Sequence, residues 1–205
     1  MLRNILYTSL LFFFSTVVVA ENHSKDIISQ EFKDAIKHVE KQQFFDAFKI
    51  FSELSEQGIP EAQYNLSVLY SNGLGAPKNY RLSLYWSWQA HLSYHETAID
   101  RVNTVYDLIN EDLRNSVAQK IIDELVTSAE AGDKDAPLKL GKTYLGLFVE
   151  PKNQLAYQWL SIAQAYGDES ASGLLTQAAE QMTLEEVLAQ QEEAQKTFES
   201  IIKID

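Results

Sequence analysis

An internal duplication constrains the fold of this chain more than any other feature of the sequence. The tripeptide Pro-Lys-Asn occurs at 77–79 and again at 151–153, a shift of 74 residues, and several neighbouring positions match at the same shift. Past this tripeptide the second copy lacks one residue, so that later matches fall 73 residues apart. Small and large residues recur in step, which indicates a copied architectural unit. The matched pairs are Gly58 with Gly132, Ala62 with Ala136, Leu66 with Leu140, Tyr70 with Tyr144, Ser83 with Ala156, Trp86 with Trp159, Ala90 with Ala163, Glu96 with Glu169 and Ala98 with Ala171.

Each copy has the spacing of helical hairpins. Ala62, Leu66 and Tyr70 recur every four residues, which places them on one face of a helix. Ser83, Trp86 and Ala90 mark the next helix in the same way. Between them, the segment SNGLGAPKN supplies glycines that end one helix and an asparagine that begins another. A period of 74 residues is about twice the length of a tetratricopeptide hairpin, so each copy is expected to hold two hairpins.

The second hairpin of each copy has a weaker signature. Ala98, Val102 and Tyr106 repeat the helical spacing, and Asn110 is positioned to cap the helix that follows. The segment from Thr183 to Glu186 is a capping box, in which the two end residues satisfy each other's backbone amides. No alternating strand pattern interrupts these stripes. We therefore predict an all-α superhelix, a solenoid of about ten antiparallel helices in tandem hairpins.

These residues resemble the Sel1-like repeats, relatives of the tetratricopeptide repeats, over about 80 residues. The first copy departs from the family pattern at Ser67, where glycine is usual, and the second copy lacks the paired glycines of the turn. The resemblance implies an α-solenoid that serves as an adaptor and binds a protein or peptide. The residues that carry it are Ala62, Leu66, Tyr70, Gly73, Gly75, Trp86 and Ala90 in the first copy and Ala136, Leu140, Gly141, Tyr144, Ala156, Trp159, Leu160 and Ala163 in the second.

The predicted organisation has six parts. A signal peptide spans 1–20, and a degenerate helical hairpin follows at 24–58. Sel1-like repeats are expected at 59–95 and 133–168, with a degenerate hairpin at 96–132 between them. Capping helices are expected at 169–205.

The N-terminal segment has the features of a signal peptide. Arg3 precedes an apolar run from about Ile5 to Val19, and a small residue, Ala20, precedes an acidic, polar segment. The run is short for a membrane span, which needs about 20 apolar residues. The absence of cysteine excludes both a lipoprotein anchor and disulfides. We therefore expect export to a bacterial periplasm or secretion, with no stable membrane span after cleavage.

Composition and motifs argue against several functional classes. A net charge of −12 and the lack of a basic cluster argue against a nucleic-acid partner. No nucleophile elbow, metalloprotease motif, P-loop or dinucleotide fingerprint occurs, so no catalytic residue, cofactor or metal is expected. His91 and His95 are spaced to share one helix face, where a metal would bridge them, although solvated histidines near a helix end are the favoured interpretation.

Two sets of residues are candidates for partner binding. Tyr85, Trp88 and Leu92 fall on one side of a helix, and the first two have polar counterparts, Gln158 and Ser161, in the second copy. They form either an exposed apolar patch or a packing surface beneath the hairpin from Ile99 onward. The family resemblance also implies a concave groove lined by the first helix of each hairpin. By helix position this groove contains Glu61, Tyr64, Val68 and Ser71 from the first repeat and Asp135, Leu138, Lys142 and Leu145 from the second. Ordinary packing between repeats is the alternative for these eight.

The sequence therefore favours a non-enzymatic, exported scaffold or adaptor of the bacterial cell envelope. Two alternatives come from other classes. One is a protein or enzyme that acts on peptidoglycan-related cell-wall material, which would need a deep pocket with converging polar groups. The other is a structural subunit of an envelope assembly, which would form a defined oligomer.

Overall fold

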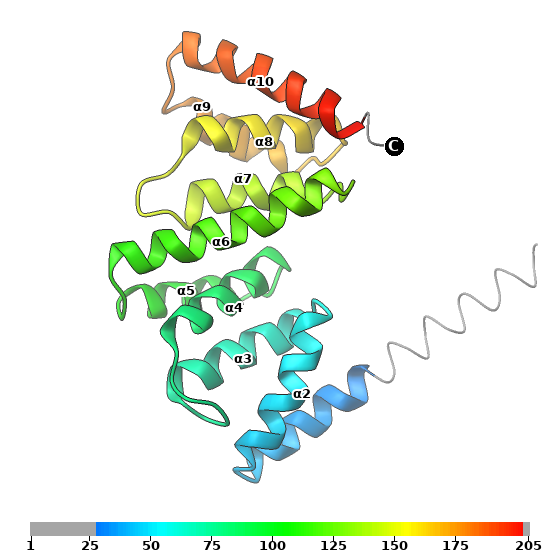
Figure 1. Cartoon of the computed structure of the whole chain (residues 1–205), viewed down its shortest axis with the longest axis vertical. Coiled ribbons are helices and arrows are strands. Elements are labelled where there is room, and N and C mark those ends of the chain that lie inside the picture. Colours follow the sequence, from blue (N-terminus) through cyan, green and yellow to red (C-terminus); the bar gives the residue numbers. More distant parts are fainter. Residues whose placement is uncertain (1–27, 203–205) are drawn as a thin grey trace, which may run out of the picture.

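The computed structural model describes residues 28–202, and within this range it contains helices and no strand (Figure 1). The predicted signal peptide, at 1–20, lies outside the described residues. A first helix is described at 28–40. The helices that follow are α2 (Phe44–Glu56), α3 (Pro60–Asn72), α4 (Tyr80–Leu92), α5 (Ala98–Tyr106), α6 (Glu111–Glu130), α7 (Ala136–Gly146), α8 (Asn153–Ala165), α9 (Ala171–Ala179) and α10 (Leu184–Ile202).

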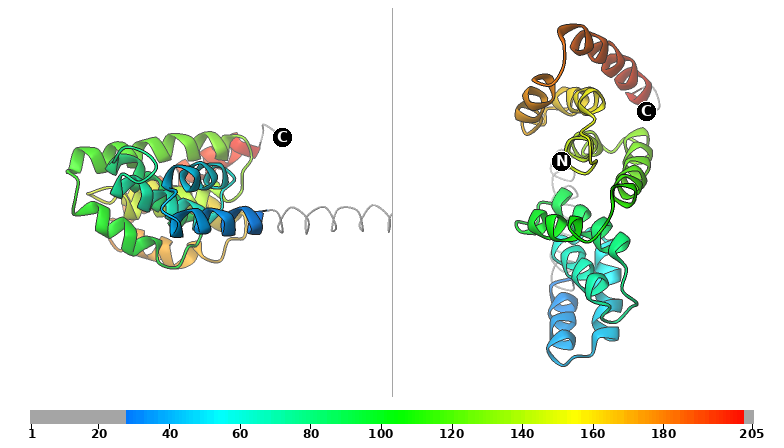
Figure 2. Two further views of the ribbon diagram at one scale, coloured as in Figure 1. Left: turned by 90° about the horizontal axis from the view of Figure 1, so that it is seen from below. Right: turned by 90° about the vertical axis from the view of Figure 1, so that its left-hand side faces the viewer.

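The helices are connected as antiparallel hairpins that stack along the long axis of the molecule (Figure 1). Helices α3 and α4 pack against each other, as do α7 and α8, whereas α5 packs mainly on α4, and α9 and α10 pack mainly on α8. The first copy of the duplication supplies the α3–α4 and α5–α6 hairpins, and the second supplies α7–α8 and α9–α10. The view in the right half of Figure 2 separates α5 and α9 on one side from α6 and α10 on the other. This arrangement confirms the prediction of an all-α array of tandem hairpins.

The capping residues expected from the sequence cap their helices. The Asn79 side chain accepts a hydrogen bond from the Leu82 amide at 3.1 Å. Asn110 does the same for α6 at 2.9 Å. In the capping box before α10, Thr183 and Glu186 exchange backbone-to-side-chain hydrogen bonds of 2.8 and 3.2 Å. Each cap satisfies amides that the first helical turn leaves free.

The structure shows where in the second copy the one-residue deletion lies. The Asn79 amide donates to the Tyr70 carbonyl at 2.9 Å, and Lys152 makes the equivalent bond to Tyr144, also at 2.9 Å. The two Tyr carbonyls lie 74 residues apart, whereas the two donors lie 73 apart. The deletion therefore falls before Lys152, in the loop between α7 and α8, and Asn153 is the first residue of α8 rather than its cap.

The core consists of two apolar clusters. The smaller one holds residues from the helix at 28–40, α2 and α3, with Phe51, Leu54 and Leu66 at its centre. The larger one begins at Leu84 of α4 and continues to Ile201 of α10. The clusters therefore meet inside the first repeat. No helix within 28–202 is both long and apolar enough to cross a membrane.

Candidate interaction surface

Four loops that connect one hairpin to the next share a single backbone motif. In each loop one residue has a left-handed conformation: Gly58 (φ 81°), Tyr94 (φ 65°), Gly132 (φ 91°) and Gly167 (φ 91°). The next residue in every case donates its amide to a carbonyl five positions earlier, at 2.9 to 3.1 Å. This is the Schellman motif, in which glycine is preferred because it has no Cβ to clash. Tyr94 is the exception.

Tyr94 occupies this strained position without the compensation of burial. Its side chain is 67% exposed, although a non-glycine residue in this conformation costs about 1 kcal/mol or more. One contact of its ring is with the Lys142 ammonium, 4.4 Å from the ring centroid. Partial burial raises the pKa of the Tyr94 hydroxyl, and the charges of Asp168 and Asp135 raise it further. The hydroxyl therefore feels two carboxylates, whereas the ring contacts an ammonium.

Two hollows flank Tyr94, and Ser93 and Tyr94 are common to both. These two residues therefore form a ridge, here called the Tyr94 ridge. The first hollow, the α3 hollow, has a volume of about 450 Å³ and is lined by the ridge and by Pro60, Glu61, His95, Glu96 and Thr97. The second, the α7 hollow, has a volume of about 370 Å³ and is lined by the ridge and by Leu92, Asp135, Leu138, Lys139 and Asp168.

The α3 hollow has a rigid aromatic wall. The His95 ring stacks on the Tyr64 ring of α3, with the centroids 4.4 Å apart and the planes inclined by 6°. Near this wall, Arg101 of α5 is bound within the first repeat, where its guanidinium donates to the Ser67 carbonyl and the Ser83 hydroxyl, each at 3.3 Å, and to the Ser71 hydroxyl. These contacts hold the loop that carries the ridge against α3.

The charges of the two hollows differ. The α3 hollow contains the carboxylates of Glu61 and Glu96, and neither makes an ion pair with another residue in 28–202. In the α7 hollow, Lys139 and the adjacent Lys142 accompany two aspartates. Burial lowers the pKa of the Lys142 ammonium, Asp168 opposes this shift, and Lys139 adds to it. The α3 hollow is therefore the more negative of the two.

The structure divides the eight groove candidates. Four gather around the Tyr94 ridge: Glu61 and Asp135 line the hollows, Tyr64 stacks on His95, and Lys142 contacts the Tyr94 ring. Two are corrected, because Ser71 is a buried hydrogen-bond partner of Arg101 and Leu138 belongs to the apolar core. Val68 and Leu145 are half-buried, and Leu145 packs against the larger cluster.

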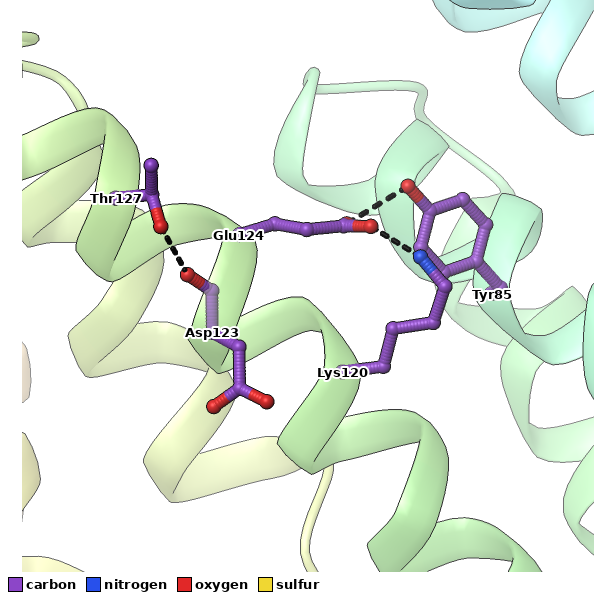
Figure 3. A network of polar contacts seen from close by, with 5 residues as sticks. All are labelled: Tyr85, Lys120, Asp123, Glu124 and Thr127. Carbon is purple, nitrogen blue, oxygen red and sulfur yellow. Dashed lines mark hydrogen bonds and ion pairs between the residues drawn. The ribbon is translucent and has the colours of Figure 1, made fainter.

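The Tyr85 set does not form an exposed patch. Trp88 is 2% exposed and Leu92 1% exposed, and the Trp88 indole donates to the Thr143 hydroxyl of α7 at 3.0 Å. Tyr85 is half-buried, and its hydroxyl donates to Glu124 of α6 at 2.9 Å (Figure 3). The Lys120 ammonium pairs with Glu124 and lies 4.6 Å from the Tyr85 ring centroid. Tyr85, whose counterpart in the second copy is the polar Gln158, therefore packs against α6 and is not part of an exposed patch.

His91 and His95 do not share a helix face, because α4 ends at Leu92 and the left-handed Tyr94 redirects the chain. The His91 ring lies against Trp88, with the centroids 4.9 Å apart. Burial lowers the pKa of His91, and the Lys142 charge lowers it further. Across the described part of the chain, no three His, Asp or Glu side chains are arranged to hold a metal ion.

Three residues of this surface, Tyr94, His95 and Arg101, are not among the sequence-based candidates for partner binding, and His95 is a sequence-based candidate only as a metal ligand. The duplication holds a signal for two of them. Tyr94 corresponds to Gly167 and Arg101 to Leu174 at the shift of 73. A bulky residue in place of a turn glycine, and a charge in place of an apolar residue, mark positions where the first copy has diverged.

Comparison with known families supports the duplication. The model of the Sel1 repeat matches residues 60–87 and 135–163, which are α3 with most of α4 and α7 with most of α8. No curated protein matches the chain.

Two solved structures are similar. A protective antigen of uropathogenic Escherichia coli that displays an SLR fold is 17% identical, with a TM-score of 0.37, and the match covers 91% of this chain and 48% of that protein. This chain thus spans about half the length of the antigen. A Sel1 repeat protein from Oxalobacter formigenes is 18% identical, with a TM-score of 0.30, and the match covers 82% of this chain and 87% of that protein.

Proposed function

We propose that this chain, in which two segments match the Sel1 repeat, is an exported scaffold that binds a protein or peptide partner in the bacterial cell envelope. Helical hairpins of this repeat type generally mediate protein–protein interactions, which supports the proposal. Hairpin arrays of this kind present a long surface on which a partner can lie. The proposal assigns partner binding to the surface around the Tyr94 ridge.

The observation that carries the proposal is the exposure of the Tyr94 side chain together with its left-handed backbone conformation. A large aromatic side chain is exposed in a backbone conformation that three equivalent loops give to glycine. Exposed tyrosines are enriched among residues that dominate binding energy at protein interfaces. Backbone strain that brings no gain in packing is typical of functional positions. Tyr94 lines both neighbouring hollows, which offer a partner further contact area.

Export rests on the sequence of residues 1–20. A basic start, an apolar run and a small residue before an acidic segment support cleavage after Ala20. Mass spectrometry of the protein purified from its native cells is expected to find a chain that begins at Glu21, in the periplasmic or secreted fraction. An intact N-terminus in the cytoplasmic fraction would contradict export.

Site-specific photo-cross-linking in native cells tests the scaffold proposal. A photoreactive residue at Glu61 or Lys142 is expected to give an adduct with one defined protein, which mass spectrometry would identify. The control positions are Lys120 on α6 and Glu192 on α10, which are exposed and lie away from the ridge. Adducts only at the control positions, or none at all, would contradict the proposal.

A further inference from the structure

We propose that the α3 hollow and the Tyr94 ridge form a receptor for an arginine side chain in an exposed, basic segment of the partner protein. This inference rests on the proposed scaffold function and adds to it the chemistry of the partner and the place where it binds. It joins the exposed Tyr94 ring to the carboxylates of Glu61 and Glu96, neither of which forms an ion pair within residues 28–202.

Charge selects a cationic occupant for the α3 hollow. Glu61 and Glu96 line it, no Lys or Arg side chain lines it, and the whole chain has a net charge of −12. On the other side of the ridge Asp135 and Asp168 are accompanied by Lys139 and Lys142, so the unbalanced negative charge lies in the α3 hollow. A basic segment would be attracted to this surface and slowed in leaving it.

The aromatic groups favour arginine over lysine. A guanidinium is planar, stacks on aromatic rings and forms paired hydrogen bonds with a carboxylate, whereas an ammonium is a strongly hydrated point charge. Lys142 of α7 already lies over the Tyr94 ring, 4.4 Å from its centroid. Tyr94 also lines the α3 hollow, which has no lysine or arginine in its lining, so a guanidinium that enters this hollow would lie near the Tyr94 ring and the carboxylates of Glu61 and Glu96.

The wall of the α3 hollow is ready for such a ligand. His95 is stacked on Tyr64 at 4.4 Å, and its Nδ1 atom is buried without a hydrogen-bond partner in the described residues. Arg101 fixes the α5 side of the same loop through its contacts with Ser67, Ser71 and Ser83. Because these groups are held in place, little side-chain entropy is lost when the ligand binds.

The test measures binding of a fluorescent peptide in which arginines alternate with glycine and serine, by fluorescence anisotropy with the mature protein at low ionic strength. Matched peptides carry lysine or glutamate in place of arginine. The arginine peptide is expected to bind more tightly than the lysine peptide, the glutamate peptide is expected not to bind, and added salt is expected to weaken binding. Equal affinity for the arginine and lysine peptides, or no binding of the arginine peptide, would overturn the inference.

Variants at Tyr94 test the role of the ring. Tyr94→Gly is expected to weaken binding of the arginine peptide by about tenfold, because a partly desolvated cation–π contact is lost. Tyr94→Asn is expected to act in the same way, since asparagine also tolerates the left-handed conformation. Tyr94→Phe keeps the ring and is expected to keep the affinity. Glycine relieves the strain, so Tyr94→Gly is expected to melt no lower than the wild type. Equal affinity of the Gly and Phe variants would overturn the inference.

A matched pair of charge variants tests the site. Glu61→Gln with Glu96→Gln is expected to weaken binding and to flatten its salt dependence. Glu150→Gln with Glu192→Gln removes the same charge from exposed positions away from the ridge and is expected to leave affinity unchanged. An equal loss in both pairs would mean that only the overall acidity attracts the peptide. A cross-linked partner whose binding is unaffected by Tyr94→Gly would leave the scaffold function standing and overturn the arginine receptor alone.

Discussion

The two Sel1 repeats of this chain have the same fold and differ in what fills the seam between their helices. In the first repeat, α3 and α4 bring four buried serines into the seam, and in the second repeat their counterparts on α7 and α8 are glycine, alanine or leucine. The pairs are Ser67 with Gly141, Ser71 with Leu145, Ser83 with Ala156 and Ser87 with Leu160. The serine hydroxyls donate to helix carbonyls: Ser83 to Ser67 at 2.8 Å, Ser87 to Leu84 at 2.9 Å. One seam is therefore polar and hydrogen-bonded, and the other is apolar and closely packed.

The neighbouring hairpin follows the same division. Arg101 of α5 binds the serines of the first repeat, whereas its counterpart Leu174 of α9 packs against the apolar core. The polar seam coincides with the boundary between the two apolar clusters. The comparison teaches that the hairpin geometry tolerates either chemistry, provided that the buried hydroxyls of the seam find hydrogen-bond partners.

The largest expected difference between the copies lies at their equivalent tryptophans. Trp159 is buried in the larger cluster, whereas Trp86 is only partly buried against the smaller one. Trp159→Ala should therefore cost about 3 to 5 kcal/mol of unfolding free energy, and Trp86→Ala should cost less. Urea denaturation of both variants checks this order. Equal losses would mean that the two seams bear equal shares of stability.

Exchanging the equivalent residues Gly141 and Ser67 between the two repeats should destabilise the protein strongly in one direction only. A Cβ at Gly141 would lie 2.4 Å from Leu160 Cγ, so Gly141→Ser forces apart α7 and α8 at a cost of about 1 to 3 kcal/mol. Ser67→Gly opens no such conflict and should cost about 0.5 kcal/mol, the difference in helix propensity between serine and glycine. Thermal melting of both variants measures the asymmetry. A Gly141→Ser variant as stable as Ser67→Gly would contradict close packing in the second seam.

Replacing the polar residues of the first seam by their apolar counterparts from the second copy should be tolerated when both residues are changed together. Arg101→Leu alone removes donors from buried acceptors and should cost about 1 to 2 kcal/mol. Adding Ser83→Ala supplies the second-copy residues at both positions, and the pair should cost less than the sum of the single changes, because an apolar contact replaces a broken network. A double-mutant cycle measures the coupling. Strict additivity would show that Arg101 and Ser83 act independently.

The smallest expected difference is in alkaline stability. Burial, and then the hydrogen bond and charge of Glu124, raise the pKa of Tyr85 from 10.0 to about 12, whereas its counterpart Gln158 does not titrate. The unfolded state therefore ionises at lower pH than the folded state. The stability contributed by neutral Tyr85 is full below pH 10.0 and is lost as the pH rises towards about 12. Tyr85→Phe should reduce the slope of unfolding free energy against pH in this window. A slope equal to that of the wild type would contradict a raised pKa of Tyr85 in the folded state.

The parts of the fold that sequence reasoning predicted are those that depend on local spacing. The stripe of Ala62, Leu66 and Tyr70 requires a helix, and Asn79 and Asn110 cap helices because their side chains reach the nearby amides. The sequence left open whether Tyr85, Trp88 and Leu92 form an exposed patch or a packing surface. The packing alternative holds, and spacing could not decide it because exposure depends on α6 and α7, which lie elsewhere in the chain. The matching of Asn79 with Asn153 was displaced by one residue, because loop hydrogen bonds rather than letter identity set the register.

By itself, the sequence determined that this protein is a stack of antiparallel hairpins, since the period of small and large residues dictates which faces of each helix must meet. Tertiary structure alone decided which of those faces stay in contact with water. Glu61, the adjacent pair Tyr94 and His95, and Asp135 come from three separate segments and form one surface only because the inter-hairpin loops gather at the same edge. The physical reason is that burial and charge are properties of a neighbourhood in space, to which distant segments contribute as much as adjacent ones.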